Sequence, residues 1–197
     1  ITFIQHPQLS KKFIYKLQTI DDKIFIFTDN NISILENDSI YDFSSQLNIF
    51  NTNFSSIEKI HEDFIITSFT NGVYIVRKNH KNEWQVKYHL NIKNGLISNE
   101  YVNAKVDQQN KIWLLSPHSI EILQASNNIY KIISLKNNIF LKNQYYPESS
   151  MYIDSNDMLY FGGKHGITIF DTKKIRLDST NNSFVQITNI YINEEKY

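Results

Sequence analysis

The stretch Gln109 to Leu123, QNKIWLLSPHSIEIL, decides the fold of this chain because its pattern occurs four times. A polar turn is followed by an apolar run, a second short polar turn and an alternating apolar run, and this order predicts a β-hairpin. The same order begins at Asp21 (DDKIFIFTDNNISIL), at His61 (HEDFIITSFTNGVYIV) and at Asn156 (NDMLYFGGKHGITIF). The chain is therefore a repeat protein, and the period identifies the repeated unit.

The period is that of a propeller blade. The apolar residues that open the first strand of each hairpin are 40, 48 and 47 residues apart, at Ile24, Phe64, Ile112 and Leu159. Another apolar segment precedes each hairpin, and a further one follows three of the four hairpins. Four strands in about 40 to 50 residues are typical of a β-propeller. We therefore expect an all-β fold of four consecutive four-stranded antiparallel units, as part of a larger propeller.

A single β-sandwich is the main alternative fold. Its strands would alternate apolar and polar residues, because one face of each sheet meets water. Several segments here are instead apolar at consecutive positions, such as FIIT from Phe64 and KIWLL from Lys111. That pattern favours sheets that are covered on both faces, as blades are. Abundant Ile, Phe and Tyr, with alanine only at Ala104 and Ala125, also favours strands over helices.

Composition excludes several classes of function. The chain has 20 basic and 20 acidic residues, so no excess of positive charge predicts nucleic-acid binding. It has no cysteine, and its six histidines lack the spacing of metal ligands. No apolar run is long enough to cross a membrane. We expect no cofactor and no metal site, and because the sequence starts at Ile1 without a signal peptide, we expect a segment of a longer protein.

Strand alternation predicts where a ligand site would lie. In each unit, the loop between the second and third strands emerges on the same side as the loop that leads into the next unit. Binding residues usually lie on such loops, which a rigid scaffold holds in place. The candidate ligand-binding residues on this side are Asn30, Asn71, Asn99, His118, Lys164 and His165.

The stretch from Asn94 to Leu123, NGLISNEYVNAKVDQQNKIWLLSPHSIEIL, resembles the repeat of the two-component regulator propellers. These are extracytoplasmic sensor domains of bacterial hybrid histidine kinases and related regulators. The matching residues in this unit are Asn94, Gly95, Leu96, Asn99, Asp107, Ile112 and Trp113; Asn110 replaces a turn glycine, and Leu115 and Ser116 replace Gly-Thr. In the fourth unit the matching residues are Asp154, Gly162, Gly163, Gly166, Ile167 and Phe170. The resemblance covers residues 13–172.

The resemblance implies a periplasmic ligand-sensing segment of a membrane-bound signalling regulator, without catalytic activity of its own. It implies a small-molecule or oligosaccharide ligand, such as a glycan fragment. It also implies contact with the remainder of the same receptor chain, and it is compatible with a homodimer. Direct contact with nucleic acid or the membrane is not expected. The alternatives are a propeller enzyme that acts on polysaccharide and a protein-interaction scaffold.

The domain boundaries expected on this basis are as follows. Residues 1–12 would be the end of a preceding blade or a lead-in strand, and residues 13–180 the four blades. Polar residues at 178–183 predict a linker. The alternating tail SFVQITNIYINEEKY then predicts the first strand of an immunoglobulin-like domain, so that linker and strand occupy residues 181–197. In the alternative, the tail is a closing strand of the fourth sheet.

Overall fold

The fold consists of successive antiparallel sheets with almost no helix. The computed structural model describes residues 7–126, 129–135, 151–163 and 166–175, and the backbone of 191–192 and 195–196. Within these ranges, helix is limited to α1 (Phe43–Gln46) and three 3-10 turns, η1 (Pro7–Leu9), η2 (Ile92–Asn94) and η3 (Thr172–Lys174). None of the described helices has the length and apolar character needed to cross a membrane.

Each repeat forms its own sheet, and consecutive strands pair in sequence order. Blade one contains β1 (Ile14–Ile20), β2 (Lys23–Thr28), β3 (Asn31–Glu36) and β4 (Ser39–Asp42). Blade two contains β5 (Phe54–Ile60), β6 (Asp63–Ser68), β7 (Val73–Lys78) and β8 (Trp84–Leu90). Blade three contains β9 (Asn103–Val106), β10 (Lys111–Leu115), β11 (Ile120–Ser126) and β12 (Ile129–Ser134). Blade four contains β13 (Met151–Ile153), β14 (Met158–Gly163) and β15 (Gly166–Asp171), so three of its strands lie in the described part of the chain.

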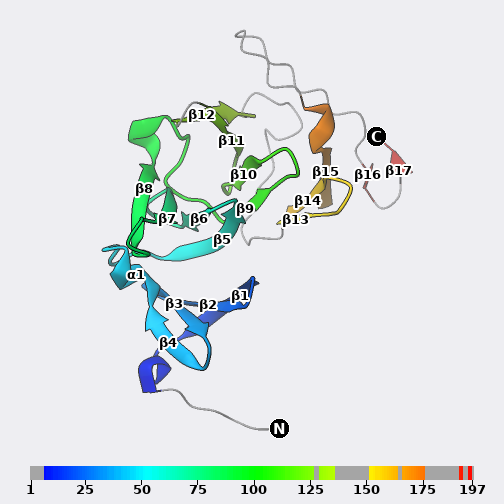
Figure 1. Ribbon diagram of the computed structural model, residues 1–197. Helices are drawn as coiled ribbons and strands as arrows, with labels where there is room; N and C mark the ends of the chain where they lie inside the picture. The colour runs from blue at the N-terminus through cyan, green and yellow to red at the C-terminus, as the bar shows by residue number, and fades with distance from the viewer. Residues whose placement is uncertain are drawn as a thin grey trace.

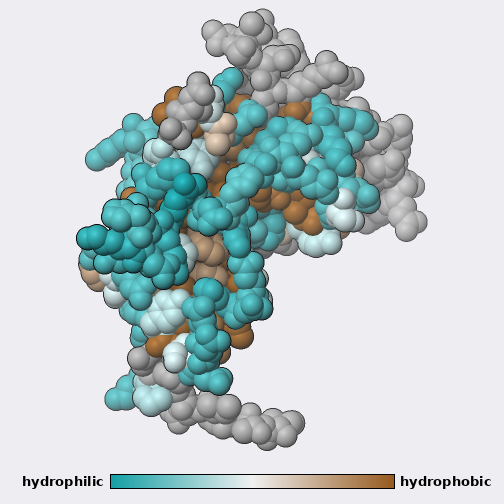
Figure 2. All heavy atoms as spheres, in the orientation of Figure 1, coloured by the Kyte–Doolittle hydropathy of each residue, from teal (hydrophilic) through white to brown (hydrophobic). Residues whose placement is uncertain are grey.

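The four blades follow one another around an arc (Figure 1). The first strand of each blade lies on the inner side of this arc, and β1, β5, β9 and β13 are neighbours in that order. Hydrophobic residues gather where blades face each other, whereas most of the visible outer surface is hydrophilic (Figure 2). The predicted all-β fold of consecutive propeller blades is confirmed.

The apolar residues form three clusters, one in each interface between neighbouring blades. Blade two contributes to two of them, because alternate residues of a strand point to opposite faces. Phe64 and Ile66 pack toward blade one, whereas Ile65 and Ile75 pack toward blade three. Trp113 is fully buried in the cluster between blades three and four. Sheets covered on both faces explain the consecutive apolar residues of the sequence, and a single sandwich is excluded.

The loop around Asn94-Gly95-Leu96 joins blade two to blade three. Gly95 adopts a positive φ of 101°, as the Asn-Gly turn predicts. Leu96 is buried in the cluster between the two blades. Asn99 Oδ1 accepts a hydrogen bond from the backbone N–H of Ile92 at 3.1 Å, and Ser98 Oγ accepts one from Glu100 at 2.9 Å. The polar residues of this loop therefore satisfy backbone groups while its leucine fills the interface.

The same loop is anchored to a buried carboxylate. The backbone N–H of Ile97 donates to both oxygens of Glu121, at 3.1 and 3.3 Å, and the hydroxyl of Tyr101 donates to the same group. Glu121 belongs to β11 and is fully buried. Burial raises the pKa of Glu121, although the hydrogen bonds from Tyr101 and Ile97 oppose this effect.

The predicted domain boundaries stay predictions. Tyr191–Ile192 (β16) pairs antiparallel with Glu195–Lys196 (β17), and β16 lies close to β15. Residues 176–190, which include the predicted linker, lie outside the described residues. Assignment of the tail to an immunoglobulin-like domain stays a prediction.

We expect Gly72→Ala to be the more damaging of two glycine substitutions. Gly72 has a φ of +80°, and an added Cβ would lie 2.2 Å from the carbonyl oxygen of Leu90, so the backbone would have to move. Gly95 has a φ of +101°, but the nearest atom to its added Cβ is Ile132 Cδ1 at 3.6 Å. Urea denaturation should show a loss of about 3 kcal/mol for Gly72→Ala and about 1 kcal/mol for Gly95→Ala. The reverse order would contradict the assigned packing of blade two.

The buried carboxylate predicts a pH dependence of stability. A carboxyl whose pKa is raised in the folded state binds its proton more readily folded than unfolded, so its contribution to stability grows as the pH falls. We expect the free energy of unfolding of the wild type to increase relative to Glu121→Gln as the pH is lowered through the raised pKa toward the ordinary value of 4.5. Denaturation curves of both proteins measure the difference, and parallel pH profiles would show that Glu121 is not desolvated.

Candidate functional site

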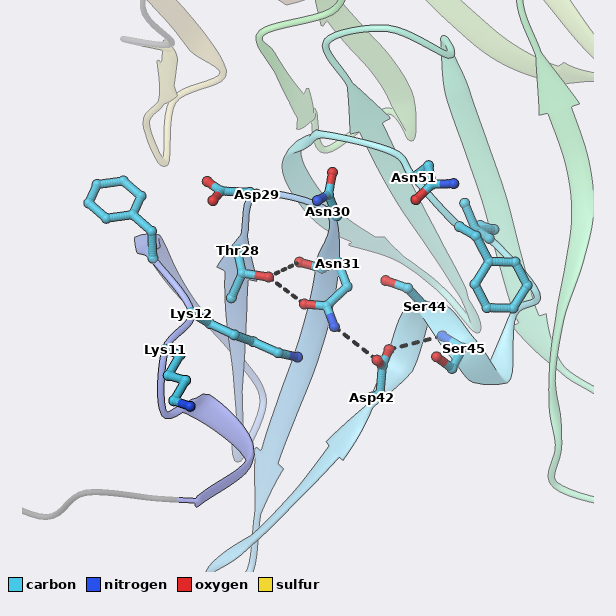
Figure 3. A pocket seen from close by; sticks show the side chains of 13 residues that line it. Lys11, Lys12, Thr28, Asp29, Asn30, Asn31, Asp42, Ser44, Ser45 and Asn51 are labelled. Carbon is cyan, nitrogen blue, oxygen red and sulfur yellow. Dashed lines mark hydrogen bonds between the residues drawn. The ribbon is translucent and has the colours of Figure 1, made fainter.

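A pocket of about 360 Å³ opens on the side of the arc where the β2–β3 turn and the loop from blade one to blade two emerge. We call this side the loop face and the cavity the loop-face pocket (Figure 3). Three segments build it: the residues that lead into β1, the β2–β3 turn, and the stretch from the end of β4 through α1 toward β5. The lining residues are Lys11, Lys12, Phe13, Thr28, Asp29, Asn30, Asn31, Asp42, Ser44, Ser45, Ile49, Phe50 and Asn51.

Helix α1 forms one wall of the pocket, and Asp42 determines where it begins. The carboxylate of Asp42 accepts a hydrogen bond from the backbone N–H of Ser45 at 2.9 Å, as an N-cap residue does. Ser44 Oγ accepts a hydrogen bond from the backbone N–H of Ile32 at 2.7 Å, which ties the helix to β3. The wall is thus fixed to the sheet of blade one.

A second hydrogen-bonded chain fixes the floor. Thr28 Oγ1 donates to Asn31 Oδ1, and Asn31 Nδ2 donates to the second oxygen of Asp42 at 2.8 Å. Figure 3 shows these three side chains in line across β2, β3 and the end of β4. Because their polar atoms are occupied by one another, Thr28, Asn31 and Asp42 shape the pocket more than they offer groups to a ligand.

Five other lining side chains keep their polar groups available. Lys11, Lys12, Asp29, Asn30 and Asn51 form no hydrogen bond or ion pair with another described residue through their side chains. Asp29, Asn30 and Asn51 lie along one rim, and Lys12 extends across the pocket toward Asn31 (Figure 3). The pocket therefore presents amide, carboxylate and ammonium groups together to a polar ligand.

Two aromatic rings flank these polar groups. Phe13 is 68% exposed and Phe50 is 63% exposed, and both line the pocket. Exposed rings of this size are costly to leave in water and offer flat apolar surfaces for a ligand to cover. Polar groups that can orient a ligand, together with rings that the ligand can cover, are features of small-molecule sites, although the lining of this pocket is mostly polar.

The charges of the lining balance, with Lys11 and Lys12 against Asp29 and Asp42. Tyr15 follows two residues after Phe13 and donates a hydrogen bond to the carbonyl oxygen of Phe54. Burial, with a smaller contribution from the charge of Asp29, raises the pKa of Tyr15 to about 12, so its hydroxyl stays protonated. A pocket without net charge does not require a charged ligand.

Four of the six residues predicted from the sequence lie in the described part of the chain, and the structure does not bring these four together in one pocket. Asn30 lines the loop-face pocket. Asn71 donates from Nδ2 to Thr52 Oγ1 at 2.8 Å, and the side chain of Asn99 accepts the Ile92 N–H. Both asparagines hold loops together, and His118 is exposed between β10 and β11, away from the pocket. The remaining two, Lys164 and His165, lie outside the described residues.

Of the residues that line the pocket, only Asn30 was predicted, and those that were missed include Lys12, Phe13, Phe50 and Asn51. The sequence does contain one signal for two of them, because NIFNTN from Asn48 places an aromatic residue in a loop rich in asparagine. Within the described ranges, no group of three or more His, Cys, Asp or Glu residues is placed to hold a metal ion.

Comparison with known proteins supports the fold. No family model matches the chain, and no curated protein matches it. The extracellular domain of the one-component system BT4673 from B. thetaiotaomicron has a TM-score of 0.63 at 16% identity, over 81% of this chain and 23% of that chain. A second structure, described as the extracellular domain of the hybrid two-component system BT4673 from B. thetaiotaomicron, has a TM-score of 0.58 at 16% identity, over 77% of this chain and 22% of that chain.

Virginiamycin B lyase from Staphylococcus aureus also shares the fold, with a TM-score of 0.54 at 18% identity, over 82% of this chain and 56% of that chain. This chain thus spans less than a quarter of the length of the BT4673 domains. At these identities the likeness establishes a β-propeller fold, one that an extracellular domain of signalling systems and an enzyme have in common.

Proposed function

We propose that this chain is a ligand-sensing propeller segment of an extracytoplasmic, periplasmic receptor and that the loop-face pocket binds the ligand. One observation carries the proposal. Five polar side chains that form no hydrogen bond or ion pair with another described residue line the pocket together with two exposed phenylalanine rings. The similarity to extracellular domains of two-component and one-component systems supports a role in sensing.

The chemistry of the pocket favours a glycan fragment as the ligand. Sugar hydroxyls can donate to carboxylate and amide oxygens, such as those of Asp29 and Asn30, and can accept from ammonium groups such as that of Lys12. The C–H faces of a sugar ring can cover Phe13 and Phe50, which removes apolar surface from water. Balanced charge in the lining suits an uncharged polyol.

Further blades of the same receptor chain would complete the propeller in this proposal. The outer faces of the first and last blades expose apolar side chains, with Leu17 62% exposed, Tyr152 63% and Ile167 57%. Interior blade faces in this chain bury such residues against a neighbour. In this proposal the segment binds the ligand and does not catalyse a reaction, and the rest of the receptor produces the signal.

Isothermal titration calorimetry with a panel of neutral oligosaccharides tests the proposal. We expect one or more of them to bind the wild type, and Phe50→Ala to weaken that binding about tenfold through loss of one ring contact. Asn30→Ala should weaken it about threefold to tenfold through loss of one hydrogen bond. Phe69→Ala is the matched control, because Phe69 is partly exposed on the same face and does not line the pocket.

Three results would each count against part of the proposal. If Phe50→Ala and Asn30→Ala bind as tightly as the wild type, the site lies elsewhere. If no oligosaccharide binds, the ligand class is wrong. If chromatography shows that the protein shortens an oligosaccharide, the propeller is an enzyme that acts on polysaccharide.

A further inference from the structure

The side of the arc opposite to the loop face carries two adjoining pockets. We call this side the turn face, because the short β1–β2, β5–β6 and β9–β10 turns lie there. One pocket, of about 360 Å³, lies between blades one and two, and the other, of about 260 Å³, lies between blades two and three. Arg77, at the end of β7, lines both pockets, and we call the combined depression the Arg77 groove.

Positive charge is exposed at the centre of this groove. Asp63 forms an ion pair with Arg77 through both carboxylate oxygens, and Lys87 Nζ lies 3.7 Å from the second oxygen of the same carboxylate. The side chain of Asp63 is 7% exposed, whereas those of Arg77 and Lys87 are 41% and 30% exposed. One buried carboxylate is thus shared by two cations, so the three groups together keep one positive charge at a point where Arg77 and Lys87 reach solvent.

A third cation, Lys78, increases this charge. Its ammonium lies over the ring of Trp84, 5.1 Å from the ring centroid, and it forms no ion pair with another described residue. Glu62 is a carboxylate on the rim that acts on Arg77. The charged residues that line the two pockets are five cations and three carboxylates, an excess of two positive charges, and Glu36, which pairs with Lys23 and acts on Lys78, reduces this excess to one.

Aromatic side chains form the apolar part of the groove. Trp84 is half-buried, and its indole packs edge to face on Phe43 and Phe64, with ring centroids 5.1 and 5.3 Å apart, which holds it in place. Tyr88 and Tyr130 meet edge to face at 5.6 Å in the second pocket. A flat apolar group can therefore lie against fixed rings while an anionic group contacts the cations.

We propose that the Arg77 groove is a second ligand site, for a small organic anion with one carboxylate or sulfate group on a flat apolar body. The guanidinium has five N–H donors, of which Asp63 uses two, so donors remain for an incoming oxyanion. This site is separate from the loop-face pocket and does not depend on the function proposed for it.

Benzoate, phenyl sulfate and benzamide are suitable probes, because benzamide has the shape of benzoate without its charge. Trp84 reports binding by its fluorescence, while Trp113 is fully buried between blades three and four and supplies a constant background. We expect benzoate to bind the full chain with a Kd of about 1–10 mM, the range for a ligand of its size. Benzamide should bind at least about tenfold more weakly.

The two charged probes identify the oxyanion that the groove prefers, and inorganic sulfate shows whether charge alone is sufficient. Equal affinity for benzoate and benzamide, or no fluorescence change with either benzoate or phenyl sulfate, would overturn the proposal. Binding of inorganic sulfate as tightly as benzoate would overturn the assignment of a flat body.

Variants place the site. Lys78→Met should weaken benzoate binding about threefold to tenfold, since it removes an exposed cation without unpairing Asp63. Arg77→Lys keeps a cation beside Asp63 but loses the planar fork, and it should weaken binding by a similar factor. Lys93→Met, on the loop face, is the control for loss of one charge and should bind as the wild type does. If Lys78→Met and Arg77→Lys both match Lys93→Met, the anion does not bind in the Arg77 groove.

Discussion

A sheet that is apolar on both faces needs a neighbouring sheet on each face, and this requirement determines how the blades are arranged. Blade two meets it with alternate residues of the same strands, Phe64 and Ile66 toward blade one and Ile65 and Ile75 toward blade three. Each fully buried side chain of this size contributes about 1.5–3 kcal/mol relative to exposure. No blade can therefore be stable by itself, and the order of the blades around the arc follows from which faces must meet.

Apolar packing does not fix how neighbouring blades are aligned, and polar contacts along the inner strands do. Ser55 Oγ donates to the carbonyl oxygen of Tyr101, and Ser56 Oγ accepts the N–H of Ala104 at 3.0 Å, which joins β5 to β9. Lys16 Nζ reaches from β1 to the carbonyl oxygen of Ser55 at 2.7 Å. Burial and the charge of Lys105 lower the pKa of Lys16 to about 8, a sign of how closely the inner strands approach.

The strands could be predicted from the sequence because each hairpin is a local pattern, and the apolar segment KIWLL from Lys111 coincides with β10. The positive φ of Gly95 also follows from a local signal, the Asn94-Gly95 pair. The loop-face pocket could not be predicted from the sequence, because Lys12 and Asn51 are 39 residues apart in the chain. They come together only where blade one packs on the loop that leads to blade two. Helix α1, which forms its wall, has four residues and no periodicity to detect. Likewise, the structural role of Asn71 depends on Thr52, a partner in another loop.

The two candidate sites share one structural element, although they lie on opposite faces of the arc. Ser44 and Ser45 of α1 line the loop-face pocket, and the neighbouring Phe43 packs edge to face on Trp84, which lines the Arg77 groove. Phe43 is fully buried, so α1 cannot shift in the pocket without disturbing the contact with that indole. A ligand that moves α1 therefore acts on both depressions. Any coupling of this kind has to be reciprocal, because each ligand changes the binding free energy of the other by the same amount.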